Sequence, residues 1–412
     1  MGLAPYGNPS SEQTLTYIKT IKDKLITIKL DGSIYLNQEY FNYATGLKMI
    51  NVEAWEKLFS FPIKNDNFEL KQHHCNLALA IQTVTEEIVL KMANTARLIT
   101  GSNNLCLAGG VALNCVSNSK ILNSSLFKDI FIQPAAGDAG GALGAALAVN
   151  YMYFNNERKP TINYMQGTYL GPFYSNKEIE RMNRKFNAVV KYFTSEKKLS
   201  IEVAKLLSCG NVIGWFQGKM EYGPRALGNR SILADAQSID MQKVVNDKIK
   251  FRESFRPFAP VVIKEDVLKY FNHITESEFM LYVASVNDAI KKELPENYLN
   301  FSMQEKLSVE RSEIQAVTHV DFSARLQTVT EESNKKLWAL IKDFKDLTGC
   351  SVLINTSFNV RSEPIVCTPE DAYRCFMETN MDFLVINNWL YKKTNQANWE
   401  NKLVWKRNFN KD

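Results

Sequence analysis

Residues 215–236 read WFQGKMEYGPRALGNRSILADA, and their first two residues end an apolar segment at 212–216. The apolar segment predicts a short buried strand, which leads into a loop with three glycines and the cations Lys219, Arg225 and Arg230. Glycine lets a backbone approach a ligand closely, and a guanidinium group grips phosphate with two parallel hydrogen bonds. A strand that leads into such a loop is typical of an anion-binding site. An ordinary surface loop with solvated charges is the alternative interpretation.

More cations and polar groups follow this loop. Between positions 219 and 256, eight lysines and arginines stand against five acids, and Arg252 and Arg256 lie next to prolines that favour an extended segment. Each arginine–phosphate bond contributes about 1.5–3 kcal/mol, so three or four suffice for a small phosphate ligand. Farther along, the polar run 355–359 ends another apolar strand, where side chains can orient a ligand. A turn that satisfies its own hydrogen bonds is the alternative there.

Two glycine-rich turns lie earlier in the chain. The first is Gly109-Gly110, after a predicted buried strand at 105–108, and the second is PAAGDAGG at 134–141, after a predicted strand at 130–133. A turn of this kind between a strand and a helix lets backbone amides and a helix N-terminus approach a nucleotide. Asp138 lies in the second turn, where its carboxylate can reach a metal ion or a nucleotide. Capping of the following helix is the alternative.

Helical and strand signals alternate along the rest of the chain. Helices are predicted from 77 to a stop at Gly101, over 196–208 and over 334–347, and strands over 25–30, 34–36, 351–355 and 383–387. Residues 151–165 lose this periodicity and predict a connection between two domains. His73 and His74 stand just ahead of the first of these helices without a carboxylate nearby, a poor pattern for a metal site. The fold class predicted is α/β.

The composition is that of a globular protein. Of 412 residues, 45% are hydrophobic and 23% charged, and 49 basic against 44 acidic residues leave a net charge of +5, which does not favour nucleic-acid binding. Seven cysteines without a Cys-x-x-Cys pair predict free thiols in a reducing compartment. No signal sequence is recognisable, and the longest apolar run, near 142–149, is too short for a bilayer. A cytoplasmic protein with no membrane partner is therefore predicted.

The stretch at 215–236 closely resembles the C-terminal signature of the O-carbamoyltransferases of nodulation-factor and antibiotic biosynthesis. Further blocks agree with that family in the same order: MGLAPYG (1–7), CLAGGVALNCVSN (106–118), QPAAGDAGGALGAAL (133–147), FRESFRPFAP (251–260), AVTHVDFSARLQTV (316–329) and LINTSFNVRSEPIVCTPEDA (353–372). The resemblance covers about 1–392, nearly the whole chain.

The resemblance implies two domains and a tail. Residues 1–155 would be the C-terminal part of an actin-like, sugar-kinase-like ATPase domain, 166–392 an α/β domain like threonylcarbamoyl-AMP synthase, and 393–412 a tail. In such proteins the MGLAPYG loop lies well inside the first domain, behind a lobe with metal-binding histidines and the first phosphate loop. The sequence therefore predicts that the family's N-terminal lobe is missing. A separate polypeptide would supply it, or the protein would be a degenerate relative.

The resemblance also implies an activity, in which the second domain binds carbamoyl phosphate and ATP and forms carbamoyl adenylate. The first domain would pass the carbamoyl group to a hydroxyl of a sugar or secondary metabolite, with a divalent metal, iron or magnesium, as Lewis acid. The catalytic cations would be Lys219, Arg225, Arg230, Arg252 and Arg256. Substrate would contact Gln217, Glu221, Tyr222, Arg325, Asn355, Ser357 and Asn359. The nucleotide would contact Gly109, Gly110, Asn114 and Gly137, and Asp138 would be the ligand left in an incomplete metal site.

Departures from the family and alternative functions accompany the resemblance. Phe322 and Ser362 replace glycines of the family, at positions where those glycines predict unusual backbone angles. A catalytically silent subunit that binds nucleotide or carbamoyl phosphate and needs an N-terminal partner is one alternative. RNA modification in the threonylcarbamoyl manner is another, although blocks 251–260 and 316–329 match the small-molecule family. His319, Asp321 and Ser323 are not expected to form a triad because the chain has no nucleophile elbow.

Overall fold

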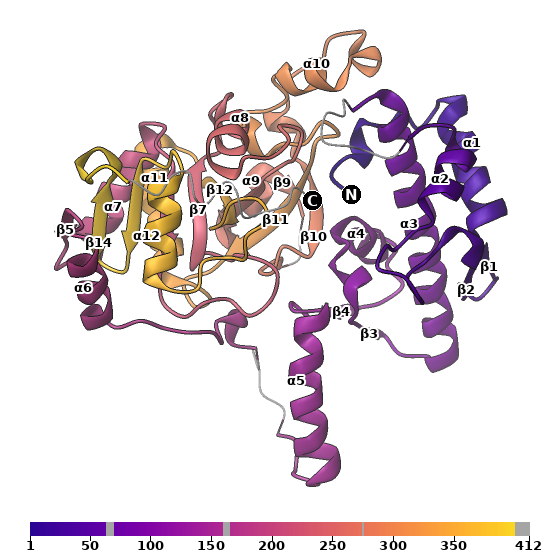
Figure 1. Cartoon of the computed structure of the whole chain (residues 1–412), viewed down its shortest axis with the longest axis horizontal. Helices are drawn as coiled ribbons and strands as arrows, with labels where there is room; N and C mark the ends of the chain where they lie inside the picture. The colour runs from indigo at the N-terminus through magenta and orange to yellow at the C-terminus, as the bar shows by residue number, and fades with distance from the viewer. Residues whose placement is uncertain (63–69, 160–164, 274–275, 400–412) are drawn as a thin grey trace. The chain divides into compact units, whose positions relative to one another are not determined.

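The computed structural model describes residues 1–62, 70–159, 165–273 and 276–399 (Figure 1). The chain forms two compact units, each assembled from segments distant in sequence. The first unit comprises Met1–Leu107, Val116–Phe131 and Pro295–Val309, and the second comprises Ala108–Cys115, Ile132–Leu294 and Glu310–Asp412. Helices and strands occur in both, which confirms the predicted α/β class. The actin-like and synthase-like identities of the predicted domains, and their boundary near 155, stay predictions.

The first unit is organised around one long helix, α3 (Gln72–Thr100), which ends as predicted because Gly101 takes a left-handed φ of 64°. A small core joins α3 to α1 and to the predicted hairpin, which pairs 26–28 with 34–36 antiparallel. The other elements wholly or mostly in this unit are α1 (Glu12–Thr20), β1 (Ile26–Ile28), β2 (Ile34–Leu36), α2 (Val52–Phe59), β3 (Asn104–Leu107), α4 (Cys115–Asn123), β4 (Asp129–Ile132) and α10 (Met303–Ser308).

Two predictions for this unit were wrong in detail. The strand expected to be buried at 105–108 is β3, whose residues alternate between exposed and half-buried positions because it pairs only with β4 in a two-stranded sheet. His73 and His74 lie in the first turn of α3 rather than ahead of it, and their rings pack against each other and against Phe61. Burial lowers the pKa of both histidines.

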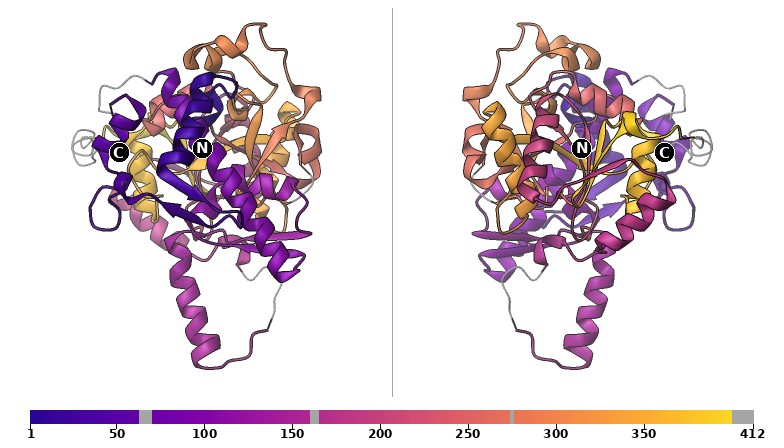
Figure 2. Two further views of the ribbon diagram at one scale, coloured as in Figure 1. Left: turned by 90° about the vertical axis from the view of Figure 1, so that its right-hand side faces the viewer. Right: turned by 90° about the vertical axis from the view of Figure 1, so that its left-hand side faces the viewer.

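The second unit contains a ten-stranded mixed sheet with the strand order β5-β14-β13-β6-β7-β12-β8-β11-β10-β9. Its strands are β5 (Val190–Tyr192), β6 (Ile213–Phe216), β7 (Arg230–Asp235), β8 (Ala259–Ile263), β9 (Phe271–Asn272), β10 (Tyr282–Val286), β11 (Ser323–Val329), β12 (Val352–Ser357), β13 (Phe383–Ile386) and β14 (Trp389–Lys392). Its helices are α5 (Asp138–Ala148), α6 (Asn176–Lys185), α7 (Glu196–Ser208), α8 (Met241–Val245), α9 (Val267–Tyr270), α11 (Lys335–Thr348) and α12 (Pro369–Glu378). Figure 2 shows α5 projecting away from the strands of this sheet.

The strand directions bring five chain segments to one edge of this sheet. β6 and β12 both run antiparallel to β7, while β8 runs antiparallel to β12 and parallel to β11. The carboxyl ends of β6 and β12 therefore meet the amino ends of β7, β8 and β11 at the same edge. The basic loop (217–229), the run 355–359 and the block 251–258 all adjoin this edge.

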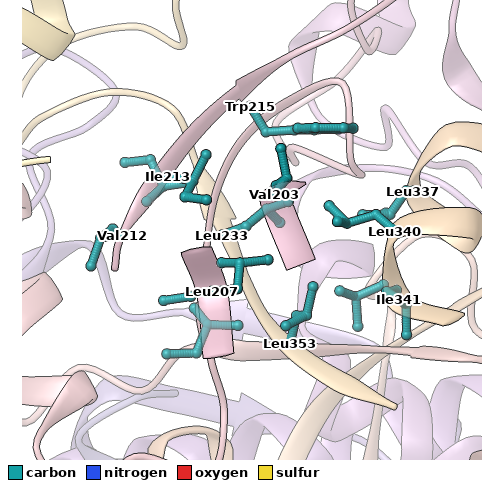
Figure 3. Close-up of a cluster of buried hydrophobic side chains, with 14 of the residues drawn as sticks. Val203, Leu207, Val212, Ile213, Trp215, Leu233, Leu337, Leu340, Ile341 and Leu353 are labelled. Atoms are coloured by element: carbon teal, nitrogen blue, oxygen red, sulfur yellow. The ribbon is translucent and has the colours of Figure 1, made fainter. Parts of the chain in front are cut away.

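Helices α7 and α11 cover one face of the central strands (Figure 3). Both helices follow the sequence predictions closely: α7 runs over the predicted residues, and α11 is capped by Asn334 and stopped by Gly349 with a φ of 77°. Val203 and Leu207 of α7 pack with Leu340 of α11 against the sheet, and all three are fully buried. Truncating a buried leucine of this kind to alanine costs about 2–5 kcal/mol. This packed face fixes β6, and with it the start of the basic loop.

Other sequence predictions are confirmed. Strand β6 is buried along its whole length. Phe322 and Ser362, which replace family glycines, take left-handed φ values of 60° and 64°. All seven cysteines are free. Among the described residues, no helix combines the length and the apolar character needed to cross a bilayer.

Gly228 tests how tightly the basic loop is packed. Its φ is 111°, and a Cβ built on it would lie 2.4 Å from Leu337 Cδ2. We expect Gly228→Ala to destabilise the protein by about 2 kcal/mol or more, from backbone strain and overlap together. Gly144→Ala is the matched control, because Gly144 lies within α5 with nothing within 4 Å of its Cβ position. That change should stabilise by about 0.5–1 kcal/mol. Urea unfolding of both variants measures the difference, and equal effects would contradict the packing argument.

Candidate functional site

The basic loop between β6 and β7 is closed by a buried carboxylate. Glu221 Oε1 accepts hydrogen bonds from the backbone amides of Leu227 (2.7 Å), Asn229 (2.7 Å) and Arg230 (3.2 Å). Burial raises the pKa of Glu221, although the bonds from the amides oppose that shift. Its second oxygen, Oε2, is buried with no hydrogen-bond partner among the described residues. Glu221, which was predicted to contact substrate, therefore has a structural role in holding the loop closed.

Arg230 lies at the base of the loop and is fully buried. Its guanidinium stacks 3.5 Å from the centre of the Phe216 ring. The terminal nitrogens donate to the carbonyls of Gln217 (2.6 Å), Asn229 (3.1 Å) and Pro172 (3.1 Å) and more weakly to that of Gly218. Burial lowers the pKa of Arg230 to about 10, so it stays charged at neutral pH. This arginine holds the loop to its strand and has little donor capacity left for a phosphate.

A buried amide network supports the loop from behind. Gln327 Nε2 and the Tyr169 hydroxyl both donate to the Leu227 carbonyl, at 2.9 and 3.0 Å. Asn355, predicted to bind substrate, instead donates to Gln327 Oε1 (2.6 Å) and to the Ala226 carbonyl (3.3 Å). The sequence analysis overlooked Tyr169 and Gln327. Gln327 lies in a strand of mixed polar and apolar residues, SARLQTV, so its amide carried no distinctive signal.

Arg225 and Arg325 differ from Arg230 in having no protein partner. Across the described residues neither forms a hydrogen bond or ion pair, and the Nε of each is buried without an acceptor. Burial and the nearby charge of Arg325 together lower the pKa of Arg225 to about 10, and the Cys115 thiol partly offsets them. Burial also lowers the pKa of Arg325. Two partly desolvated cations thus lie close together without a carboxylate between them.

Arg252 extends this arginine cluster (Arg225, Arg252 and Arg325). Burial and the charges of Arg256 and Arg325 together lower its pKa to about 10. Its Nε donates to Asn246 Oδ1 (2.7 Å) and its guanidinium lies 4.9 Å from the centre of the Phe258 ring. In the described part of the chain, its terminal nitrogens have no protein acceptor.

The remaining predicted cations lie at the margin. Arg256 is 46% exposed at its side chain and pairs with Glu253 at 2.9 Å, and Lys219 is exposed. Lys250, which was not predicted as a site residue, is buried and donates to the hydroxyl of Ser357 (3.1 Å) and to Asn359 Oδ1 (2.7 Å). Ser357 and Asn359, two of the three predicted substrate contacts in the run 355–359, are therefore engaged with Lys250.

The glycine-rich turns adjoin the basic loop within the second unit. Gly109 donates its amide to the Ala136 carbonyl (2.8 Å), which joins the first turn to the second. The Tyr222 hydroxyl donates to the Ala139 carbonyl, and a Cβ on Gly223 would lie 3.3 Å from Ala135 Cβ. Gly109 has a φ of 94°, and the space at its Cβ position is open for 4 Å. The same space is open at Gly110, and only a Leu113 methyl at 3.8 Å approaches it at Gly137. Asn114 ends the short 3-10 turn after Gly110.

Asp138 is the first residue of α5, with Gly137 at the N-cap position. The described residues contain no group of three or more histidine, cysteine, aspartate or glutamate side chains that could hold a metal ion. The donor set around Asp138 therefore does not fit a metal site. Its role as a metal ligand stays a prediction, and we derive no step through a metal.

Comparison with known proteins identifies two family models. The carbamoyltransferase N-terminus model matches residues 1–147, and the carbamoyltransferase C-terminus model matches 204–393. An uncharacterised protein of Synechocystis sp. (sll1178) is 51% identical over 418 residues, covering 100% of this chain. Nodulation protein NolO of Bradyrhizobium diazoefficiens is 35% identical over 95% of this chain. The 3'-hydroxymethylcephem-O-carbamoyltransferase of Streptomyces clavuligerus is 32% identical over 78%.

These comparisons correct one prediction. The sequence analysis placed the start of the chain deep inside the first domain and concluded that the N-terminal lobe is missing. That conclusion was wrong, because the N-terminus model matches from residue 1 to residue 147. The chain spans 66%, 65% and 55% of the lengths of the three relatives above. A solved structure of full-length HypF, bound to phosphate and nucleotide, aligns with 64% of this chain over 36% of the HypF chain, at 14% identity. Its TM-score of 0.31 is too low to indicate a shared fold.

The raised pKa of Glu221 gives a prediction of pH dependence. A carboxyl whose pKa is higher in the folded state stabilises the fold fully below its unfolded pKa, near 4.3, and loses that contribution as the pH rises through the folded pKa. Glu221→Gln keeps an acceptor oxygen but cannot ionise. We therefore expect the free energy of unfolding of the variant, relative to the wild type, to increase as the pH rises above about 4.3 and to level off above the folded pKa of Glu221. Urea titrations at four pH values measure it.

Glu221→Ala is the control for this prediction. It removes the acceptor of three amides and should destabilise at every pH, by about 2 kcal/mol or more. A pH-independent difference between wild type and Glu221→Gln would show that the carboxyl titrates alike in the folded and unfolded states.

Proposed function

The chain belongs to the carbamoyltransferase family, and from this premise we propose that it is an ATP-dependent O-carbamoyltransferase. Carbamoyl phosphate and ATP bind at the arginine cluster, and the carbamoyl group is passed to a hydroxyl of a small molecule. The relatives give the acceptor its class: one is named for O-carbamoylation of a hydroxymethyl group on a cephem, and another is a nodulation protein.

One observation carries the proposal, namely the unpaired state of Arg225 and Arg325. A buried charge without a partner is costly, and two like charges side by side add to that cost. A dianionic phosphate would relieve both costs, because each guanidinium can offer it two parallel hydrogen bonds. Arg252 adds terminal donors to the same site. No carboxylate is among the groups that shift the pKa of Arg225 or of Arg325, so an anion has to come from a ligand.

The arginines act by electrostatic stabilisation. Water cleaves carbamoyl phosphate to carbamate and phosphate, and a carbamate oxygen then attacks the α-phosphorus of ATP, which forms carbamoyl adenylate and releases pyrophosphate. Negative charge develops on the departing phosphate and pyrophosphate. Donors fixed in place before the reaction stabilise that charge without reorganising. Arg230, Glu221 and the amide network keep the loop in that prepared geometry.

The nucleotide would contact the glycine-rich turns. Gly109, Gly110 and Gly137 leave open space for a close approach, and the second turn touches the basic loop through Tyr222. The silent-subunit alternative lost its support when the N-terminal match was found. The cytoplasmic localisation expected from the sequence stays a prediction.

Arg225→Gln tests the proposal directly. Loss of one charge-assisted contact of about 1.5–3 kcal/mol should weaken carbamoyl phosphate binding roughly 10- to 100-fold. Thermal stability should stay equal or rise, because a buried unpaired charge is removed. Isothermal titration with carbamoyl phosphate, and separately with inorganic phosphate, measures the affinity. Release of pyrophosphate from ATP should fall in parallel.

Arg184→Gln provides the matched control. Arg184 is exposed on α6, so its loss changes net charge equally without touching the cluster. Affinity should stay at the wild-type value. Wild-type affinity in Arg225→Gln, or an equal loss in both variants, would overturn the phosphate assignment.

A further inference from the structure

A cavity of about 260 Å³ lies where α7, α11 and the end of β6 meet. It is lined by the first turns of both helices, by Trp215 and Gln217, and by Asn388 after β13. None of the residues of the arginine cluster lines it. Trp215 lies at one end of the core that α7 and α11 form against the sheet (Figure 3).

Two buried polar groups of this cavity have no partner. Trp215 is 2% exposed and Ser200 is 6% exposed. Within the described residues, neither Trp215 Nε1 nor Ser200 Oγ forms a hydrogen bond. Buried donors are nearly always satisfied in native proteins, so each such exception calls for an explanation. A ligand that accepts hydrogen bonds from both groups provides one.

The potential in the cavity favours an anion. Helices α7 and α11 both begin at its wall, and their caps Ser195 and Asn334 each accept one amide, from Lys198 and from Leu337. The other amides of the first turns lack an intrahelical acceptor, and each helix carries partial positive charge at this end.

The side chains at the wall add to this charge. Lys197, Lys335 and Lys336 line the cavity with one acid, Glu196. Lys336 pairs with Glu196 at 3.0 Å and donates to Gln217 Oε1 at 3.2 Å. Lys335 is 78% exposed at its side chain, and its nearest acid is Glu331 at 3.7 Å. Lys197 forms an ion pair with Asp343, so Lys335, whose acid lies farthest away, adds the least neutralised charge to the wall.

The walls also define the body of the ligand. Trp215, Leu199 and Ala339 present apolar surface, and no arginine fork is among the lining residues. We propose that the cavity binds a small carboxylate with an apolar body, such as an aromatic or branched acid. The carboxylate faces the helix starts and accepts from Trp215 Nε1–H and the Ser200 hydroxyl, and the body packs on the apolar wall.

The site is separate from the arginine cluster and does not depend on the proposed function. Successive side chains of a strand point to opposite faces, so Trp215 faces the cavity while Phe216 faces Arg230. Gln217 links the cavity to Arg230: it lines the cavity, and its carbonyl accepts a hydrogen bond from Arg230.

The Trp215 indole N–H is the reporter for the test. The full chain is labelled with ¹⁵N-tryptophan, its indole resonances are recorded, and Trp215→Phe assigns the one that disappears. Sodium benzoate is the probe, with sodium chloride and inorganic phosphate titrated separately. We expect a saturable shift of the Trp215 resonance with benzoate alone. Arg225→Gln should leave this titration unchanged, which separates it from a failure of the proposed function.

Variants at the wall decide the mode of binding. Ser200→Ala and Lys335→Gln should each weaken benzoate binding roughly fivefold or more, because each removes one donor or charge. Ala339→Leu should abolish benzoate binding by filling the cavity. If Ala339→Leu does not fold, Ser200→Ala still tests the proposal, provided that its thermal unfolding matches that of the wild type. Lys342→Gln is the control, since Lys342 lies exposed on α11 outside the cavity. No saturable shift, an equal shift with chloride or phosphate, or an equal loss in Lys342→Gln would overturn the proposal.

Discussion

The Glu221 carboxylate gathers three backbone amides of one loop, and the placement of the cations depends on that closure. A loop of this length, rich in glycine, loses much conformational entropy when it is ordered. The buried carboxylate, the amide network behind it and the stacking of Arg230 on Phe216 compensate for that loss. Because these contacts lie beneath the loop, they leave Arg225 free of protein partners. A ligand then meets donors that are already in position.

Arg225 and Arg230 lie five residues apart in the same motif but differ in their contacts. Arg230 donates to the carbonyls of four residues and serves the fold, whereas Arg225 donates to none among the described residues and remains available. Sequence alone could not separate them, since both are arginines beside glycines in a loop. The difference arises because Arg230 opens a strand and points into the packed base of the loop. The number of hydrogen bonds to protein acceptors, and not the charge, distinguishes the arginine that is available to a ligand.

Much of the fold could be predicted because its signals are local. Capping residues, glycine stops and apolar periodicity gave α7, α11 and β6 within a residue or two, and the missing glycines at 322 and 362 foretold their left-handed angles. What depended on distant partners could not be predicted. The amide of Gln327 carries no sign of its bond to the Leu227 carbonyl, 100 residues away. The error about the N-terminal lobe had another source: the loop at the start of the chain was interpreted through the family resemblance and not from its own residues.

Three of the non-glycine residues with a left-handed backbone lie around the same edge of the sheet. Phe251, Phe322 and Ser362 have φ values of 50°, 60° and 64°, and none is a glycine. Each costs free energy, and such residues persist only where surrounding contacts over-determine them. Phe251 directly precedes Arg252, and Phe322 lies three residues before Arg325. Besides burial, the charge of Arg325 lowers the pKa of both Arg225 and Arg252, so the fold holds these like charges close together at a cost in free energy that a bound anion would offset.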